Sequence, residues 1–361
     1  MDTARDPSPR FDDAKAEQFA GRMMMALNDA AMVMMTSIGH RTRLFDSLAD
    51  MPPSSLKEIA ARAGLSERYV REWLAVMVTS RVIDYDAVDQ TYQLPAEHAA
   101  FTTRAATPDN FAVAAQYIPL AAGIEDIIVD RFRTGEGVHY HDYARFHEVM
   151  AEDSGQTVVA ALFDHILPLA PGLTGQLKRG IDVLDVGCGR GKALLKLAEA
   201  FPASRFRGMD LSREAVDHAN ASAREAGLSN IRFTAADLST QERFGTFGLI
   251  TAFDAVHDQK DPQGLLDAVA RSLNPGGLFL MQDVGGSSHL ERNADHPLGP
   301  FLYAISTLHC TPVSLAQGGP GLGTMWGEEL ALDMLGQAGF GNVTVERLPH
   351  DPINVYYLAR V

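Results

Sequence analysis

Residues 181–192 read IDVLDVGCGRGK, and this stretch decides the fold that we predict for the chain. Ile181, Val183, Leu184 and Val186 form a short apolar run that is interrupted by two aspartates, which predicts a strand buried on both faces. Three glycines follow at alternate positions, and the next residues, KALLKLAEAF, have helical spacing. A strand, a glycine turn and a helix bring backbone N–H groups close to a ligand. The glycine spacing alone does not distinguish a ligand site from a tight turn, so the residues downstream must decide.

After this turn, predicted strands and helices alternate to the end of the chain. Acids follow the ends of the next three predicted strands: Asp210 after 206–209, Asp237 after 231–235, and Asp254 and Asp258 after 247–253. LNPGG precedes a fifth strand at 278–284, and the last two strands, GNVTVERL and NVYYLAR, are predicted to pair antiparallel. An acid about 20 residues after a glycine turn can accept both hydroxyls of a ribose. The pattern predicts an α/β fold, a doubly wound sheet with its site at the carboxyl ends of the strands.

Composition limits the class of protein. The 361 residues are 46% hydrophobic and 21% charged, which is enough for two domains with sizeable cores. The formal net charge of −15 disfavours a broad nucleic-acid or anionic-membrane surface. The two cysteines, Cys188 and Cys310, do not indicate a disulfide framework. Since there is neither a secretory signal pattern nor an apolar run of about 18 residues, we predict a cytoplasmic protein without a membrane partner.

The amino-terminal region predicts a helical dimerisation domain. Residues 1–14 are polar, contain two prolines and are predicted to be a disordered tail. A helical pattern then runs from Lys15 to Leu48, with MMMALNDAAMVMM at its centre. Because apolar side chains cover most of its circumference, we expect a second copy of the chain to bury one face and form a homodimer.

A winged helix-turn-helix pattern completes a mainly helical domain at 15–104. Ser55–Ala63 and Ser66–Arg81 read as two helices, with Gly64 closing the first and Ser66 capping the second, and VIDYDAVDQTYQL reads as a β-hairpin. Two interpretations are open, a DNA-binding regulator and a packing scaffold. From His40 to Arg104 there are eight Lys or Arg against nine Asp or Glu. This balance favours the scaffold, and we do not expect a nucleic-acid partner.

Residues 105–175 are predicted to be a helical linker that also contributes to a substrate pocket. Two histidines, His139 and His141, flank Tyr140 within an aromatic cluster. On a helix, side chains two positions apart point in different directions, so we do not predict a metal site from this pair. Tyr140 and His141 are instead candidates for the lip of a substrate pocket, with structural packing as the alternative.

VLDVGCGRG, the acids Asp210 and Asp237, and LNPGG together resemble the class I S-adenosylmethionine-dependent methyltransferases. The resemblance covers 176–361 and implies a Rossmann-like sheet of seven strands with S-adenosyl-L-methionine as cofactor. Dinucleotide dehydrogenases share the first turn and the acid on the second strand, but not LNPGG or the Asp237-Leu238 pair.

The resemblance also implies roles for single residues. Gly187 and Gly189 would let the backbone approach the methionyl part of the cofactor, and Asp185 would orient its ammonium. Asp210 would hold the ribose, and Asp237 the adenine amino group. Leu211 and Leu238 would lie against the ring faces, and Phe253 would line the methyl-transfer chamber. The alternative for each acid is a solvated loop carboxylate.

Val256-His257-Asp258 resembles the His-Asp pair of small-molecule O-methyltransferases of the plant caffeate and bacterial polyketide type. The resemblance implies that His257, paired with Asp258, is the general base that deprotonates a small-molecule hydroxyl as it attacks the methyl group. An unperturbed imidazole pKa near 6.5 suits that role. Gln259 stands where that family usually has a tryptophan, and a packed loop histidine is the alternative.

A long insertion between Val284 and Trp326 predicts a lid or a substrate wall. Three of its residues and one beyond it are candidates for the substrate pocket, with core packing as the alternative: His309, Met325, Trp326 and His350. Its glycine-rich run at 318–323 lacks the G-K-[ST] ending of a phosphate loop.

Three functional alternatives remain open from the sequence. A cofactor-sensing transcriptional regulator would keep the fold and use the winged helix, and methylation at nitrogen or carbon would keep the chemistry. Metal-assisted transfer would need a cluster of three ligands, to which Asp254 and Asp283 could contribute, but no third ligand is evident and we predict no metal. The identity of the acceptor is not encoded in any motif.

Overall fold

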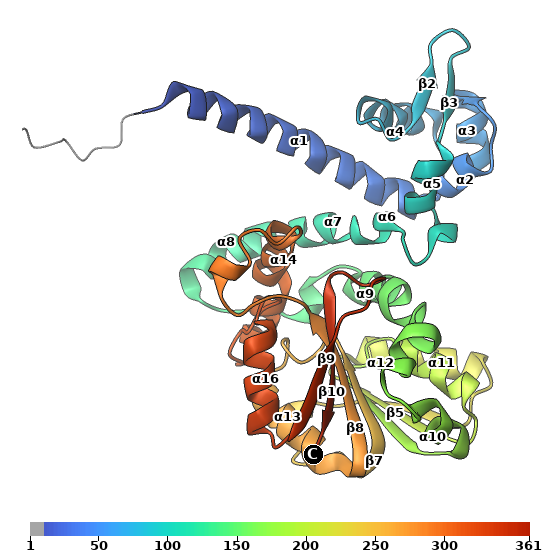
Figure 1. Cartoon of the computed structure of the whole chain (residues 1–361). Helices are drawn as coiled ribbons and strands as arrows, with labels where there is room; N and C mark the ends of the chain where they lie inside the picture. The colour runs from blue at the N-terminus through green and yellow to red at the C-terminus, as the bar shows by residue number, and fades with distance from the viewer. Residues whose placement is uncertain (1–10) are drawn as a thin grey trace, which may run out of the picture. The chain divides into compact units, whose positions relative to one another are not determined.

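The computed structural model describes residues 11–361 and divides after Gln116 into two compact units, each of which is described by itself (Figure 1). Most of the predicted tail, residues 1–10, lies outside the described residues. Helix α1 (Asp13–Arg41) already begins inside the predicted tail, because Asp12 caps it by accepting a hydrogen bond from the Lys15 backbone N–H.

The helical pattern predicted as one element from Lys15 to Leu48 forms two helices. After α1 the chain turns, and α2 (Leu44–Ala49) begins behind Arg43, which has a positive φ of 61°. A left-handed residue cannot continue an α-helix, so the helical pattern ends here although no glycine or proline marks it.

The winged helix-turn-helix is confirmed. Its elements are β1 (Ser54–Ser55), α3 (Leu56–Ala63), α4 (Glu67–Thr79), β2 (Asp84–Asp86) and β3 (Thr91–Gln93), and the three strands lie in the order β1-β3-β2. Ser55 and Glu58 form a capping box at the start of α3, and Gly64 ends that helix in the left-handed conformation. Ser66 occupies the cap position of α4, but its side chain makes no capping hydrogen bond.

Trp73 anchors α4 to α1. Its ring packs edge-on against Phe45 with centroids 5.2 Å apart, and its Nε1 donates a 2.8 Å hydrogen bond to the Met35 carbonyl.

The first unit continues with α5 (Ala96–Thr102) and α6 (Phe111–Ala114). The amino-terminal half of α1 has exposed apolar side chains: Phe19, Met23, Met24, Met25 and Leu27.

The second unit, Tyr117–Val361, contains the remaining helices and the main sheet. Its α-helices are α7 (Tyr117–Ala122), α8 (Glu125–Thr134), α9 (Phe146–Ser154), α10 (Leu173–Arg179), α11 (Lys192–Ala200), α12 (Arg213–Glu225), α13 (Pro262–Ser272), α14 (Gly299–Ile305), α15 (Thr311–Ala316) and α16 (Gly327–Gln337). The shorter helical turns relevant below are η2 (Tyr140–Asp142) and η8 (Ser306–Cys310). Among the described residues no single helix has the length and apolarity to cross a bilayer, although a pair bent by 58°, Phe111–Ala122 with Glu125–Thr134, reaches that threshold by length and composition.

A seven-stranded sheet forms the centre of this unit. Its strands are β4 (Asp182–Val186), β5 (Arg205–Asp210), β6 (Ile231–Ala235), β7 (Phe247–Phe253), β8 (Leu273–Val284), β9 (Asn342–Glu346) and β10 (Asn354–Arg360), in the order β6-β5-β4-β7-β8-β10-β9. The first five strands of this order run parallel, and β10 is antiparallel to both of its neighbours. The predicted doubly wound sheet and its antiparallel last pair are therefore confirmed.

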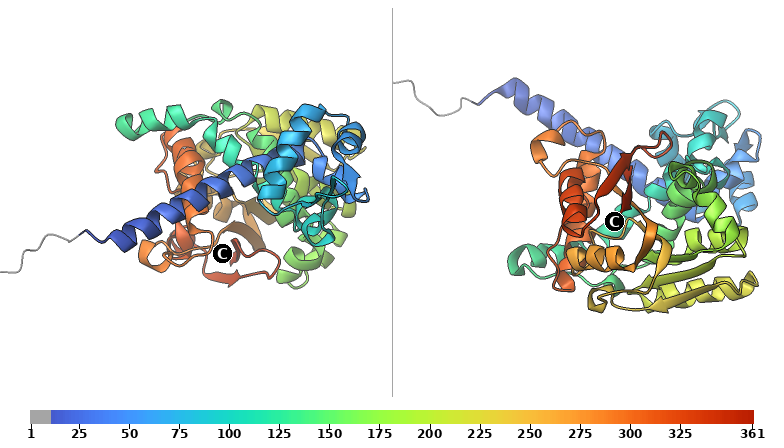
Figure 2. Two further views of the ribbon diagram at one scale, coloured as in Figure 1. Left: turned by 90° about the horizontal axis from the view of Figure 1, so that it is seen from above. Right: turned by 60° about the horizontal axis from the view of Figure 1, so that its bottom comes forward.

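Helices cover both faces of the sheet, with α10, α11 and α12 on one side and α13 and α16 on the other (Figures 1 and 2). The side chains of β4, within residues 181–192, show why the sheet is buried on both faces. Val183 belongs to the apolar cluster on the α11 side, whereas Leu184 and Val186 belong to the cluster on the α13 side. This arrangement leaves the carboxyl ends of the parallel strands as the edge at which polar side chains gather.

Candidate functional site

The three glycines of the turn after β4 all have positive φ angles, but they meet different surroundings. A Cβ atom at Gly187 would lie 2.4 Å from Cβ of Ala255, and one at Gly191 would lie 2.3 Å from the Phe233 ring. A Cβ atom at Gly189 would meet nothing within 4 Å. Gly187 and Gly191 are therefore required by packing inside the protein, and Gly189 is the position that faces open space.

Asp210, at the end of β5, ties this turn to the start of α12. Its Oδ2 accepts a 2.8 Å hydrogen bond from the Gly189 N–H, and its Oδ1 accepts one of 2.8 Å from the Ser212 N–H. Burial raises the pKa of Asp210, and these two hydrogen bonds oppose that shift. Asp210, which was predicted to bind the ribose, thus also holds in place the glycine turn that was predicted to lie against the methionyl part of the cofactor.

Asp237 and Asp185 lie along the same edge of the sheet. Asp237 accepts hydrogen bonds from the Ser239 backbone N–H (2.9 Å) and hydroxyl (2.6 Å), both on Oδ1. Asp185 is buried and accepts a 2.7 Å hydrogen bond from the Thr251 hydroxyl, and burial raises its pKa to about 7.

The three apolar side chains predicted to contact the cofactor differ in exposure. Leu211 is 45% exposed and is therefore available to a ligand. Leu238 is buried in the cluster on the α13 side, and Phe253 is partly buried against the cluster on the α11 side.

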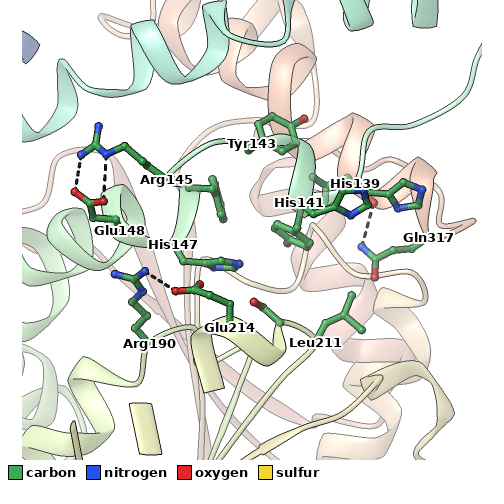
Figure 3. Close-up of a pocket in the computed structure, with 14 residues that line it drawn as sticks. His139, His141, Tyr143, Arg145, His147, Glu148, Arg190, Leu211, Glu214 and Gln317 are labelled. Atoms are coloured by element: carbon green, nitrogen blue, oxygen red, sulfur yellow. Dashed lines mark hydrogen bonds and ion pairs between the residues drawn. The ribbon is translucent and has the colours of Figure 1, made fainter. Parts of the chain in front are cut away.

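A cavity of about 710 Å³ lies beside this edge, and Figure 3 shows the side chains around it. It is lined by His139, Tyr140, His141, Tyr143, Arg145, Phe146, His147, Glu148, Arg190, Leu211, Ser212, Glu214, Val313 and Gln317. The structure thus brings the predicted Tyr140 and His141 to the same cavity as the predicted Leu211. His139 and His141 do not diverge as on a helix: His139 precedes η2 in an extended conformation, and the two rings stack with centroids 5.3 Å apart.

Two ion pairs belong to the wall of this cavity. Arg190 pairs with Glu214 at 2.5 Å, and Arg145 pairs with Glu148 at 2.6 Å. Between them, burial lowers the pKa of His147, and the nearby carboxylates Asp210 and Glu214 oppose that shift. His147 was not singled out from the sequence because its place in the cavity depends on the packing of α9.

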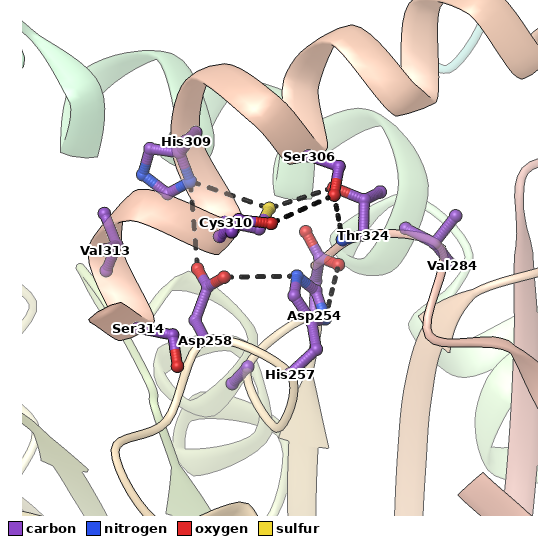
Figure 4. A network of polar contacts seen from close by, with 12 residues as sticks. Asp254, His257, Asp258, Val284, Ser306, His309, Cys310, Val313, Ser314 and Thr324 are labelled. Carbon is purple, nitrogen blue, oxygen red and sulfur yellow. Dashed lines mark hydrogen bonds and ion pairs between the residues drawn. The ribbon is translucent and has the colours of Figure 1, made fainter. Parts of the chain in front are cut away.

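His257 lies in the loop after β7 with both ring nitrogens facing carboxylates (Figure 4). Nδ1 lies 2.8 Å from Oδ1 of Asp283 at the end of β8, so it is the nitrogen that carries the donating proton, and Nε2 lies 3.4 Å from Oδ1 of Asp258. Burial lowers the pKa of His257, but Asp283 and Asp258 outweigh that effect and hold it well above its usual value.

Asp283 is a site residue that sequence reasoning considered only as a metal ligand. Its Oδ1 also accepts hydrogen bonds from Trp326 Nε1 (3.1 Å) and from the Val284 N–H (2.8 Å). The signal that could have found it is its position at the end of the strand next to β7, since neighbouring parallel strands end at one edge. Trp326, predicted as a pocket wall, is buried, helps to orient Asp283 through this hydrogen bond and does not line the cavity described above.

His309 and Tyr140 connect the cavity to the His257-Asp258 pair. The Tyr140 hydroxyl donates a 3.3 Å hydrogen bond to Oδ2 of Asp258. Nδ1 of His309 lies 3.8 Å from the same oxygen, and its ring stacks on Phe146 at 4.0 Å. Burial lowers the pKa of His309 to about 4, so this imidazole is neutral.

Two further predicted pocket residues lie elsewhere. Met325 packs with Val284 and Leu302 in a separate apolar cluster. His350 stacks on His165 with ring centroids 4.8 Å apart, and it is absent from the lining of the described cavity.

Two separate stretches of the chain match families of known proteins. Residues 177–307 match the family model described as a methyltransferase domain, and residues 30–104 match the Rv2258c-like winged HTH domain. (S)-coclaurine N-methyltransferase of Papaver somniferum is 32% identical over 109 residues, which are 30% of this chain and 31% of that protein. A sterol 24-C-methyltransferase of Aspergillus fumigatus is 28% identical over 200 residues, 54% of this chain and 48% of that protein. The chain therefore spans less than half the length of these curated relatives.

Solved structures resemble the chain over nearly its whole length. Human N-acetylserotonin methyltransferase, in complex with SAM, has a TM-score of 0.65 at 17% identity and covers 100% of this chain and 99% of its own. The mitomycin 7-O-methyltransferase has a TM-score of 0.66 at 18% identity and covers 97% of this chain and 100% of its own. At these identities the likeness establishes the fold, which agrees with the one predicted from the sequence.

Proposed function

We propose that this chain, in which a winged HTH domain precedes a methyltransferase domain, transfers the methyl group of S-adenosylmethionine to a hydroxyl oxygen of a small molecule, with His257 as general base. The observation that carries the proposal is the position of His257. It is held by Asp283 at the same strand edge at which Asp210 holds the glycine turn.

The residues at this edge fit S-adenosylmethionine. Gly189 faces open space, Asp210 is placed next to it, and the exposed Leu211 offers an apolar surface to a ring. Asp237 uses only Oδ1 for its own turn, which leaves Oδ2 for an amino group. When bound, the cofactor supplies a methyl group already activated by its sulfonium, so the protein needs only to position the acceptor and remove one proton.

His257 is arranged to take that proton. Asp283 holds a proton on Nδ1, so once His257 has lost its other proton, Nε2 carries the lone pair that can accept the hydrogen of the acceptor hydroxyl. Because the two carboxylates raise the pKa of His257, the base form becomes available only as the pH rises. The imidazolium that forms is stabilised by Asp283 at Nδ1 and by Asp258 beside Nε2. Tyr140, which lines the cavity and contacts Asp258, connects this pair to the space for an acceptor.

The regulator alternative finds little support in the charges of α4. Arg68 and Arg71, which would face a phosphate backbone, form ion pairs with Glu72 and Glu67 on the same helix. A helix whose cations are matched by its own acids attracts DNA weakly. We therefore assign the winged helix-turn-helix domain the role of a packing scaffold.

A homodimer and a cytoplasmic location are further parts of the proposal. The exposed apolar half of α1, centred on Met23, Met24 and Met25, supports a face that a second copy covers. Both cysteines are free thiols, which suits a reducing compartment.

The test is methyl transfer from S-adenosylmethionine carrying a labelled methyl group, using panels of phenols, aliphatic alcohols, amines and carbon acids. We expect transfer to a hydroxyl panel, with loss of transfer but retained cofactor binding in His257→Ala. His218→Ala, an exposed histidine on α12, is the matched control. Undiminished transfer by the His257 variant would remove the base assignment, and transfer only to amines or carbon acids would remove the hydroxyl acceptor. Sequence-specific DNA binding at physiological salt, without transfer, would favour the regulator.

A further inference from the structure

Three different donor atoms gather around the His257-Asp258 pair. One ring nitrogen of His257, one carboxylate oxygen of Asp258 and Sγ of Cys310 all lie within 4.8 Å of one another, and all three residues are buried. They come from two distant segments, the loop after β7 and the turn η8 of the insertion (Figure 4). We propose that these three residues, the His-Asp-Cys cluster, bind a Zn²⁺ ion.

The donor set suits zinc by chemistry and by spacing. Zinc takes imidazole nitrogen, carboxylate oxygen and thiolate sulfur at roughly 2.0–2.3 Å, so neighbouring ligands around a tetrahedral ion lie roughly 3.3–3.8 Å apart. The atoms His257 Nε2 and Asp258 Oδ1 are already 3.4 Å apart. The Asp258 side chain is only 9% exposed, and its Oδ1 is buried without a hydrogen-bond partner. The neighbour of Oδ1 is Nε2 of His257, at ion-pair distance but without a hydrogen bond, so a cation held between the two atoms would satisfy this oxygen.

Groups around the cluster hold the ligands in position. Asp283 accepts a hydrogen bond from Nδ1 of His257, the arrangement in which a carboxylate orients a metal-bound histidine. Trp326 in turn fixes Asp283. The Thr324 hydroxyl donates a 3.0 Å hydrogen bond to Sγ of Cys310. These contacts orient two of the three donor side chains from outside the cluster.

A second group of donors, Asp254, His257 and Asp283, is a weaker candidate. The nitrogen of His257 that faces it, Nδ1, is already engaged with Asp283, and the group contains no sulfur. The His-Asp-Cys cluster supplies three protein ligands, and His309 is a further candidate donor beside it. Nδ1 of His309 lies 3.7 Å from Cys310 Sγ and 3.8 Å from Asp258 Oδ2. Three protein ligands and an open position are typical of zinc sites that exchange a ligand.

One consequence follows for the activity, and it rests on the proposed function. A zinc ion on Nε2 of His257 occupies the lone pair that would accept the proton of the acceptor. Zinc binding therefore inhibits base-dependent methyl transfer, and removal of zinc by a chelator restores it.

Metal binding is tested on the full-length chain with Co²⁺ as a spectroscopic substitute and with Zn²⁺ in competition. We expect one ion per chain and a thiolate-to-cobalt charge-transfer band that zinc abolishes. Cys310→Ser should remove that band, whereas Cys188→Ser, which changes the other cysteine, should keep it. Asp283→Asn should weaken cobalt binding by roughly 10–100-fold, since loss of a hydrogen-bonded partner of a metal-bound histidine has that effect. Circular dichroism of each variant confirms that it is folded.

The outcomes separate the two proposals. A wild-type chain without a thiolate band, or a Cys310→Ser chain that binds cobalt as tightly as wild type, overturns the zinc site. Zinc that binds but raises methyl transfer overturns the inhibitory consequence. A metal-free chain without any transfer contradicts the proposed function and leaves the cobalt spectrum as an independent measure of the site. If Cys310→Ser does not fold, Asp258→Asn, which preserves the size of the side chain, should weaken cobalt binding, and binding as tight as wild type overturns the zinc site.

Discussion

Nδ1 of His257 and Oδ1 of Asp283 lie 2.8 Å apart although 26 residues separate them in the chain. Their strands, β7 and β8, are parallel neighbours, so the loop after one and the last residues of the other meet at the same edge. A carboxylate in this position sets both the tautomer and the orientation of the imidazole. The catalytic proposal therefore depends on a residue that does not contact the acceptor.

Replacing Asp283 with Asn should lower kcat roughly 100-fold, because the imidazole loses the charge that orients it and stabilises its protonated form. The acceptor KM and the affinity for S-adenosylmethionine should stay unchanged, since Asp283 acts through His257. Steady-state kinetics and calorimetric titration of the cofactor measure both. Asp333→Asn, an exposed aspartate on α16, is the control. An Asp283 variant with a raised KM and normal kcat would contradict the positioning role.

Asp210→Asn should weaken cofactor binding at least roughly tenfold. The amide places an N–H group opposite the N–H of Gly189 or of Ser212, where the carboxylate accepts from both. The variant therefore loses one of the hydrogen bonds that hold the glycine turn and the start of α12, and also a carboxylate oxygen that would bind the ribose. Calorimetry with S-adenosylhomocysteine gives the affinity, and Asp217→Asn, an exposed acid on the following helix, should bind as wild type. Equal affinities for the two variants would count against the assigned role of Asp210.

Asp185 should make stability dependent on pH. Its pKa is raised by burial to about 7, whereas an unfolded aspartate titrates near 3.9. Between these values the folded chain binds more protons than the unfolded chain, so the contribution of Asp185 to stability falls as pH rises and is lowest above pH 7. Asp185→Asn keeps an acceptor for Thr251 without the charge. Its gain in unfolding free energy over wild type should grow by about 3 kcal/mol from pH 4.5 to pH 8.

Urea unfolding of the cofactor-free chain at the two pH values measures this difference. Asp182→Asn, at the partly exposed start of β4, provides a comparison outside the buried centre. A difference between Asp185→Asn and wild type that stays constant with pH would refute the assignment.

The exposed apolar half of α1 should mediate self-association. Phe19 and Leu27 are 62% and 69% exposed, and charging both in Phe19→Glu/Leu27→Glu should convert a dimer into a monomer. Light scattering on a size-exclusion column at micromolar concentration measures the mass. Arg22→Gln on the same helix should leave the dimer intact. A wild-type chain that already elutes as a monomer would refute the predicted dimer.

The sheet could be predicted because each of its central strands is short, apolar on both faces and followed by a glycine turn or an acid. The end of α1 could not be predicted, because Arg43 adopts a positive φ of 61°, which is unusual for arginine. Cofactor-side residues such as Asp210 follow strand ends and were found from spacing. Cys310 was not found from spacing, because only the packing of the insertion brings it close to His257, which lies more than 50 residues earlier in the chain. Sequence spacing thus locates residues on one strand edge, but not those that a long loop returns to it.

The hydrogen bond from Trp326 to Asp283 gives the protein an optical reporter of its own site. The chain has two tryptophans, and the other, Trp73, lies in the winged-helix unit. In a Trp73→Phe background the tryptophan fluorescence, excited selectively over that of tyrosine, comes from Trp326 alone. Because indole emission responds to nearby charge and to its hydrogen-bond partner, the emission of Trp326 reads out the state of the carboxylate that orients His257, without any attached dye.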